Sequence, residues 1–162
     1  PQARERAHAL RAEADAVLVG SGTVLADDPL LTVRLPGYEG PQPLRVVLDR
    51  RARVPRTAQV FDPSAPTLVL ADAEPQGALA ALWERGVRSV LVEGGATIAG
   101  AFLRAGLVDE LRCHVAPLLL GEKGVPLVIG DGITTLSEAH RFRLRTVEHV
   151  GDDALLTLAR SG

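Results

Sequence analysis

The chain has 162 residues, of which 46% are hydrophobic and 23% are charged, a balance typical of folded globular proteins. This length favours one domain that buries a core without disulfide bonds. The single cysteine, Cys113, excludes an intramolecular disulfide, and the scattered histidines argue against a Cys/His zinc site, so we expect no bound metal. A net charge of -2 with 3% aromatic residues argues against a dedicated nucleic-acid binder. No apolar stretch approaches the ~20 residues of a membrane span and no secretory signal opens the chain, so we expect a cytoplasmic protein without membrane contact.

The first two thirds of the chain alternate between helix and strand patterns. Alanine and leucine recur at helical spacing in residues 1–14, which predicts an amphipathic helix. Four apolar, β-branched runs predict strands, at 15–20, 44–49, 67–71 and 88–93, and the last of these is apolar enough to suggest burial on both faces. Ser21-Gly22 is interpreted as a turn. Helices are predicted over 78–85, ended by Gly86, and after Gly94-Gly95, stopped by Gly106.

The last third changes to strand patterns with hardly any helix. Residues 109–120, 140–150 and 154–160 look like strands, and the last two predict an antiparallel hairpin across Gly151-Asp152-Asp153. Helix and strand alternation followed by strands indicates an α/β domain. Its sheet is expected to be mixed and mostly parallel, with an antiparallel C-terminal edge.

A glycine pair follows the strand predicted at 88–93. Glycines at a strand-to-helix junction let a ligand approach the backbone, and the first N–H groups of the helix favour an anion such as a pyrophosphate. A tight turn is the alternative interpretation of Gly94-Gly95, and the spacing lacks the GxGxxG fingerprint of dinucleotide-binding folds. Glu93 ends this strand, where open α/β sheets place ligands, although a capping or surface carboxylate would look the same.

Residues 20–34 (GSGTVLADDPLLTVR) interleave polar and apolar side chains directly after the first predicted strand. Asp27 and Asp28 before a proline can form a simple turn. The alternative is a loop that holds a carboxylate for proton transfer and the Arg34 guanidinium for a phosphate.

Positive charge follows the strand at 44–49, in Arg50, Arg51 and Arg53. Such a cluster can bind the 2′-phosphate that distinguishes NADP from NAD, and a solvated turn is the alternative. The four histidines are assigned to surface or sheet positions, and no GxSxG motif is present.

Four stretches together closely resemble the C-terminal reductase domain of the bifunctional riboflavin-biosynthesis deaminase-reductases. They are DAVLVGSGTVLADDPLLTVR, PLRVVLD, VLVEGGATIAGAFLRAGLVDEL and VAPLLLG. The resemblance implies a three-layer, dihydrofolate-reductase-like fold with helices on both faces of the sheet, and a homodimer. It also implies the NADPH-dependent reduction of 5-amino-6-(5-phosphoribosylamino)uracil to the phosphoribitylamino product. The hydride reaches C1′ of the ribosyl group as its ring opens.

The same resemblance implies roles for individual residues. Cofactor contacts carry over to Thr23, Asp27, Gly95, Ala96, Thr97, Ile98, Ala99, Gly100 and Ala101, and to Arg50, where relatives often carry a small polar residue. Substrate contacts carry over to Arg11, Leu31, Arg34 and Glu93. The chemistry agrees, because two guanidiniums suit a ribose 5-phosphate and a carboxylate accepts from pyrimidine N–H groups. Asp27 is our candidate for assisting proton transfer to the substrate.

Family members carry an upstream strand with an SLDG-like turn, and the deaminase carries zinc motifs of the HxE and PCxxC type. Residues 1–162 contain neither. We therefore expect residues 1–162 to be a single reductase domain of a longer protein, lacking its N-terminal strand, and an upstream zinc deaminase is compatible with this interpretation. Two alternatives stay open: a related pyrimidine or pterin reductase of the same fold, and a noncatalytic NADP-binding module.

Overall fold

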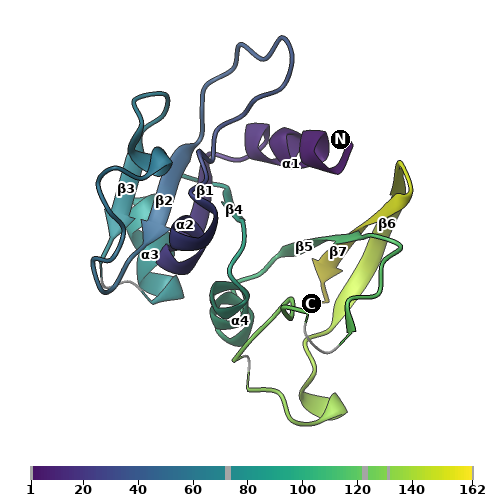
Figure 1. Cartoon of the computed structure of the whole chain (residues 1–162). Coiled ribbons are helices and arrows are strands. Elements are labelled where there is room, and N and C mark those ends of the chain that lie inside the picture. Colours follow the sequence, from purple (N-terminus) through teal and green to yellow (C-terminus); the bar gives the residue numbers. More distant parts are fainter. Residues whose placement is uncertain (1, 72–73, 122–123, 131, 162) are drawn as a thin grey trace.

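The computed structural model describes residues 2–71, 74–121, 124–130 and 132–161, and within them seven strands form two sheets (Figure 1). The helices are α1 (Gln2–Ala12), α2 (Ser21–Asp27), α3 (Pro75–Trp83) and α4 (Ala96–Arg104), with short 3-10 turns η1 (Gln59–Phe61) and η3 (Leu136–Glu138). The strands are β1 (Ala16–Gly20), β2 (Leu44–Leu48), β3 (Thr67–Leu70), β4 (Val90–Val92), β5 (Glu110–Val115), β6 (Phe142–Val150) and β7 (Asp153–Arg160).

The first sheet is parallel, with the order β3-β2-β1-β4. Ala16 of β1 stands opposite Leu44 on one side and Val90 on the other. The second sheet is antiparallel, with the order β5-β7-β6, and its β6–β7 hairpin turns at Gly151 and Asp152. The α/β class, the parallel sheet and the hairpin predicted from the sequence are therefore confirmed. The antiparallel strands form a sheet of their own instead of extending the edge of the parallel one.

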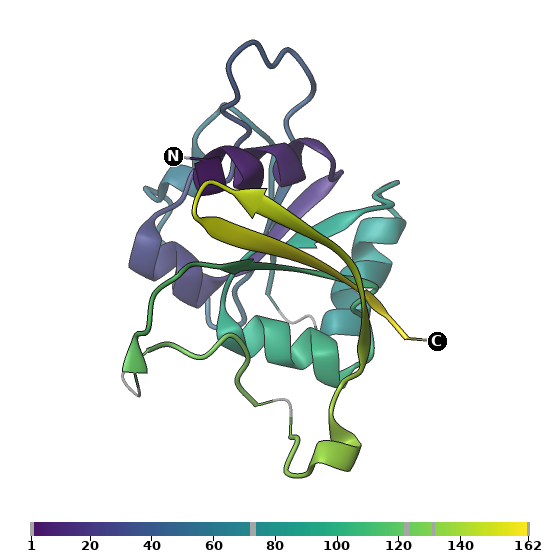
Figure 2. The ribbon, with the colours of Figure 1, turned by 90° about the vertical axis from the view of Figure 1, so that its right-hand side faces the viewer.

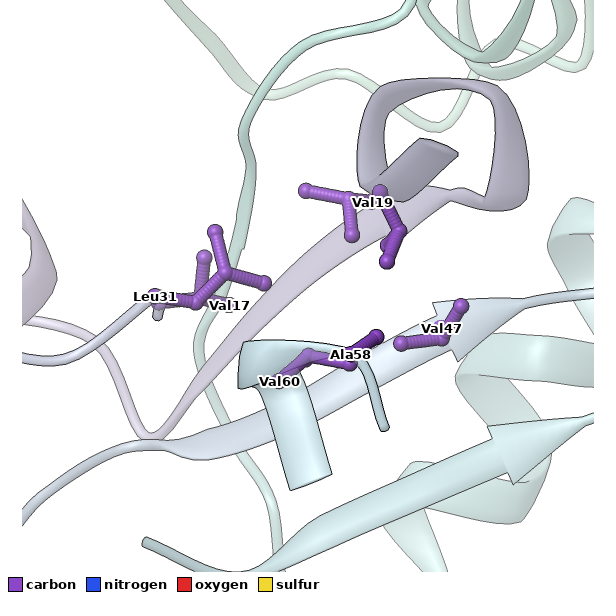
Figure 3. Packing of buried hydrophobic residues seen from close by; sticks show 7 residues of the cluster. Val17, Val19, Leu31, Val47, Ala58 and Val60 are labelled. Atoms are coloured by element: carbon purple, nitrogen blue, oxygen red, sulfur yellow. The ribbon is translucent and has the colours of Figure 1, made fainter. Parts of the chain in front are cut away.

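Two apolar clusters sandwich the parallel sheet, because alternate side chains of a strand point to opposite faces. Val17 and Val19 of β1 pack on one face, together with Val60 of η1 (Figure 3). Val24 of α2 belongs to the same cluster. On the other face, Leu18 of β1 packs among residues of α3 and α4. That cluster contains Ala16, Leu18, Val46, Leu82, Val87 and Phe102. The parallel sheet thus has helices on both faces.

One local prediction was wrong, and another holds in part. Ser21-Gly22 is not a turn but the start of α2, which runs directly on from β1. Glycine and β-branched residues disfavour a helix here, but Val24 is buried in the core, and such tertiary packing overrides weak propensity. The expected burial of residues 88–93 on both faces holds in part. Leu91 of β4 packs on one cluster and Val90 and Val92 pack on the other, but all three are only half-buried because β4 is at the edge of its sheet.

Helix α1 connects the two sheets. Its Arg6 forms an ion pair with Glu148 of β6 at 3.1 Å, and its Arg11 forms one with Glu93, the residue after β4. Figure 2 shows α1 lying beside the β6–β7 hairpin. A side chain on Gly151, in the hairpin turn, would meet Gln2 at the start of α1. The position of this helix therefore depends on both sheets.

Candidate active site

Parallel strands β1, β2 and β4 end at one edge of their sheet, which is where open α/β sheets bind ligands. Gly20 ends β1 and leads into α2, Asp49 follows β2, and Glu93 follows β4. The segments that leave this edge carry most of the site residues predicted from the sequence.

The glycine pair after β4 packs against Thr23 of α2. Gly94 and Gly95 have φ angles of 87° and 85°, which residues with a side chain rarely adopt. A Cβ on Gly95 would lie 3.3 Å from Oγ1 of Thr23. Gly95 caps α4 without a side-chain hydrogen bond, and the first N–H groups of a helix have no partners within it. The turn therefore presents open backbone at the start of α4, with Thr23 beside it.

The start of α4 also lines a cavity of about 290 Å³. Thr97, Ile98 and Ala101 line it from α4. Arg50, Arg51 and Arg53 line it from the turn after β2. Three guanidiniums beside a helix N-terminus make this cavity suited to a phosphorylated ligand.

Asp49 organises the arginine turn. Its carboxylate is 2% exposed and accepts a hydrogen bond from the backbone N–H of Val54 at 2.9 Å. Burial raises the pKa of Asp49, but hydrogen bonds from the N–H groups of Val54 and Arg53, with the charge of Arg53, outweigh burial and bring the pKa below its ordinary value. Arg53 also donates to Oγ of Ser21 at 2.9 Å. The turn is thus tied to the start of α2.

The two neighbouring aspartates after α2 differ in their surroundings. Asp28 accepts hydrogen bonds from the backbone N–H and side-chain amide of Gln59, at 2.8 and 3.2 Å. Asp27, the last residue of α2, is exposed, and its side chain makes no hydrogen bond or ion pair with the described part of the chain. It lies one helical turn after Thr23, and residues four apart share a helix face. Asp28 therefore holds the loop, whereas the Asp27 carboxylate is available to a ligand.

Residues 28–34 are fixed in an unusual backbone conformation. Asp28 and Leu31 have φ angles of 40° and 54°. A bulky residue rarely adopts a positive φ, and such strain persists only where the surroundings enforce it. Leu31 is 1% exposed in the apolar core, and the buried Arg45 donates to the carbonyl of Leu30 at 3.3 Å. The Leu31 side chain points into the core, so any ligand contact at this position would have to come from its backbone.

Arg11 and Glu93, predicted from far-apart segments, form a bidentate ion pair. Nε of Arg11 lies 3.0 Å from each carboxylate oxygen of Glu93, and Nη2 lies 2.6 Å from one of them. Nη1 donates to the carbonyl of Thr32 at 3.0 Å. The side chains are 13% and 26% exposed, so neither is fully desolvated. Arg11 holds the Glu93 carboxylate at the edge of the sheet where β4 ends, and it joins this carboxylate to the segment that carries Arg34.

One prediction about the histidines was wrong. His8 is not at a surface or sheet position but is 6% exposed on α1, with its ring against the backbone of residues 32–34. The one sequence signal for His8 is its position, since it lies one helical turn before Arg11.

Gln42 was also not identified from the sequence. This side chain binds both the N–H and the carbonyl of Val33, at 2.7 and 3.2 Å.

Two residues predicted to contact the cofactor, Ala96 and Gly100, contact segment 124–130 of the chain itself. A Cβ on Gly100 would collide with the backbone of Ile129, so the close approach of segment 124–130 requires glycine here. The carbonyl of Ala96 accepts a hydrogen bond from the N–H of Ile129 at 3.0 Å. Gly100 is buried, whereas Gly95 and Thr97 are exposed. Within the described ranges, no three metal-binding side chains cluster and no helix has the length and apolarity to cross a bilayer.

Comparison with known proteins agrees with this geometry. The RibD C-terminal domain family matches residues 1–156. The chain belongs to this family. It is 48% identical to the riboflavin biosynthesis protein RibD of Mycobacterium tuberculosis over 96% of its own length and 45% of that protein. It is 34% identical to the 2,5-diamino-6-ribosylamino-4(3H)-pyrimidinone 5′-phosphate reductase of Methanothermobacter thermautotrophicus, over 97% of this chain and 85% of that one.

A solved structure of a RibD protein has the same fold as this chain. The diaminohydroxyphosphoribosylaminopyrimidine deaminase/5-amino-6-(5-phosphoribosylamino)uracil reductase of Thermotoga maritima superposes with a TM-score of 0.88 at 30% identity. The match covers 99% of this chain and 49% of that one. The chain thus spans about half the length of the RibD proteins it matches. The dihydrofolate-reductase-like reductase fold implied by the sequence resemblance is confirmed.

Proposed function

We propose that this RibD reductase domain reduces 5-amino-6-(5-phosphoribosylamino)uracil to 5-amino-6-(5-phosphoribitylamino)uracil with NADPH, in riboflavin biosynthesis in the cytoplasm. One observation carries the proposal. An anchored carboxylate, Glu93, directly precedes the glycine turn in the chain, and the start of α4 directly after the turn lines a phosphate-suited cavity with three arginines. A cofactor bound along the turn would lie between the two.

The residues around the turn fit a dinucleotide phosphate. Side chains at Gly94 and Gly95 would crowd Thr23, so the turn leaves room for close approach to the backbone. Arg50 and Arg51 are exposed and line the cavity, where they can pair with a phosphate such as the 2′-phosphate of NADPH. When bound, NADPH supplies the hydride.

The chain's own residues would bind and activate the substrate. Arg34 offers an exposed guanidinium to the 5-phosphate, and Glu93 accepts from N–H groups of the pyrimidine. The reduction adds a hydride at C1′ while the bond from C1′ to the ring oxygen breaks and that oxygen gains a proton. The side chain of Asp27 has no partner among the described residues, and we assign to it the delivery of this proton.

The test is substrate-dependent oxidation of NADPH by the longest natural chain that contains residues 1–162, with the substrate generated in place by a separate deaminase. Oxidation that requires the substrate supports the proposal. NADPH binding without oxidation, with this substrate and with its relatives, would instead support the noncatalytic binding module.

The Methanothermobacter relative favours a second candidate substrate, since that protein is named for the 2,5-diamino pyrimidinone and the match covers 85% of it. This substrate carries an amino group where the uracil carries a carbonyl. Comparing kcat/KM for the two compounds decides between them, and the account expects the uracil to be preferred.

We expect the paired variant Arg50→Ala/Arg51→Ala to raise KM for NADPH by about 10-fold to 100-fold, the loss expected when one charge-assisted hydrogen bond of ~1.5–3 kcal/mol to the 2′-phosphate is removed. KM for NADH should change little, since NADH lacks the 2′-phosphate. The measurement is initial rates with each cofactor. Arg143→Ala, on the exposed face of β6, is the matched control. Equal losses for both cofactors would assign the arginines to the shared pyrophosphate.

We also propose that residues 1–162 are one reductase domain of a longer protein, and that a strand from outside them pairs between β4 and β5. Among the described strands, β4 pairs with β1 and β5 with β7, so each presents a free edge. We further propose a homodimer, for which Leu144 and Val147 on the edge strand β6, each 54% exposed, provide apolar surface. An upstream zinc deaminase domain accords with the greater length of the RibD relatives.

The added strand predicts slower hydrogen exchange at the β4 and β5 amides in the longest natural chain than in residues 1–162 alone. Strand pairing protects amides on both edges. The β6–β7 amides serve as the internal control, because they are paired in either case. Equal exchange at β4 and β5 in the two proteins would contradict the added strand.

A further inference from the structure

The imidazole of His8 lies against the backbone of the segment that carries Arg34. Its Nδ1 is 3.2 Å from the backbone nitrogen of Arg34 and 3.0 Å from the carbonyl oxygen of Thr32. The residue is 6% exposed, so water cannot readily replace either interaction. One ring nitrogen can donate or accept, but it cannot satisfy both neighbours at once.

The neighbouring Arg11 favours one of the two interactions, because it gives the Thr32 carbonyl a donor whichever tautomer His8 adopts. Its Nη1 already donates to the Thr32 carbonyl at 3.0 Å. The backbone N–H of Arg34 has no acceptor other than His8 among the described residues. All three groups are satisfied when Nδ1 is bare and accepts from Arg34, with the proton on Nε2.

A second side chain also holds the segment of residues 32–34. Gln42 binds both backbone groups of Val33. His8 and Gln42 therefore hold consecutive peptide units of residues 32–34, while the side chain of Arg34 remains exposed. Fixing the backbone at the base of a long side chain lowers the entropy lost when its guanidinium binds a ligand.

We propose that His8 is a positioning residue: its neutral ring fixes the backbone of Arg34, so that protonation of the ring weakens binding of the phosphorylated substrate. This rests on the proposed function, in which Arg34 binds the 5-phosphate. A protonated ring would turn Nδ1 into a donor to the Thr32 carbonyl, which leaves the N–H of Arg34 without its acceptor. It would also place a third positive charge beside Arg11 and Arg34.

The charges that face His8 come from three elements. Burial lowers the pKa of His8 below its ordinary 6.5, as do Arg11 of α1 and Arg34 of the facing segment; the Thr32 carbonyl and Glu93, after β4, raise it by less. Because the folded-state pKa is lowered, the unfolded chain binds more protons below pH 6.5. The contribution of the neutral His8 ring to the free energy of unfolding is therefore fully present above this pH, and it is lost as the pH drops towards the folded-state pKa.

Two variants of the longest natural chain test the proposal in steady-state assays. His8→Gln keeps an acceptor for Arg34 and cannot become charged, whereas His8→Leu removes the acceptor. Near neutral pH we expect His8→Leu to raise KM for the substrate by about 10-fold, through loss of a buried hydrogen bond. KM for NADPH and kcat should change little, and His8→Gln should restore substrate KM to within about 3-fold of the parent.

Substrate KM should rise between about pH 7 and pH 5 in the parent and less in His8→Gln. Unchanged substrate KM in His8→Leu, or the same acid rise in His8→Gln, would overturn the proposal.

A measurement without turnover separates this proposal from the proposed function. Nitrogen-15 NMR of the imidazoles, with His8 assigned from the spectrum of His8→Gln, reports the protonated nitrogen. We expect the Nε2–H tautomer, a pKa below 6.5, and an Arg34 amide resonance that shifts with the same titration. A proton on Nδ1 at neutral pH would overturn the role of His8 even if the enzyme is active. The expected tautomer in an inactive protein would contradict the reductase proposal alone.

Discussion

Replacing Asp27 with asparagine is expected to lower the rate of hydride transfer by about 100-fold or more, because general acid assistance contributes ~10²–10⁴-fold. NADPH affinity should change by less than about 3-fold, since the carboxylate makes no contact with the described residues that would organise the cofactor site. Single-turnover oxidation of NADPH and a separate binding titration measure the two quantities.

Asp28 provides the matched control for this change. It is the adjacent aspartate, and its carboxylate is engaged by Gln59. Asp28→Asn keeps one oxygen to accept from the backbone N–H, so it should cost some stability and leave hydride transfer within a few-fold of the parent. Equal losses of transfer rate and NADPH affinity in Asp27→Asn would make Asp27 a binding residue. Equal effects of the two variants on transfer would indicate loop disruption.

Replacing Glu93 with glutamine is expected to lower kcat/KM by about 100-fold to 1000-fold, because it removes a substrate acceptor and leaves the partly buried Arg11 without its charge partner. Breaking such a pair from one side is more costly than removing both partners. The double variant Glu93→Gln/Arg11→Gln should therefore lose much less than the sum of the two single losses. Kinetics and urea unfolding of all four proteins complete the cycle.

Glu148→Gln is the control for the Glu93 change, since it also removes a carboxylate paired with an arginine of α1. The Arg6–Glu148 side chains are 31% and 42% exposed, and exposed pairs contribute ~0–1 kcal/mol. Glu148→Gln should therefore leave kcat/KM near the parent value. Strictly additive single losses in the Glu93 cycle would mean that the two residues act independently, contrary to the geometry.

The strands were predictable because their signals are local. Val17 and Val19 alternate with Ala16 and Leu18 on a strand covered on both faces, so the whole run is apolar and short. The glycine turn and the β6–β7 hairpin carry their own signals as well. Helix α2 was not predictable from propensity, since its stability comes from burying Val24 in a core cluster that also contains Val47 of β2 and Val60 of η1.

Family motifs named the candidate site residues, and their roles stay predictions. The partners of these residues in the structure were not predictable. Nothing local indicates that Arg11 meets a carboxylate 82 positions away, or that His8 faces the backbone of Arg34. Leu31 and Gly100 lie within matching motifs, yet one side chain is in the core and the other position packs on Ile129. Such contacts depend on how distant segments meet, which periodicity does not encode.

The central claim is a hydride transfer to C1′ of the ribosyl group, and isotope transfer tests it most directly. The longest natural chain would be incubated with the phosphoribosylaminouracil and NADPH deuterated at C4 of the nicotinamide, in separate reactions for the two C4 positions. The account predicts one deuterium at C1′ of the ribityl product from one of the two labelled cofactors, detected by NMR and mass spectrometry. A reduced product with no deuterium at C1′ from either cofactor would contradict it.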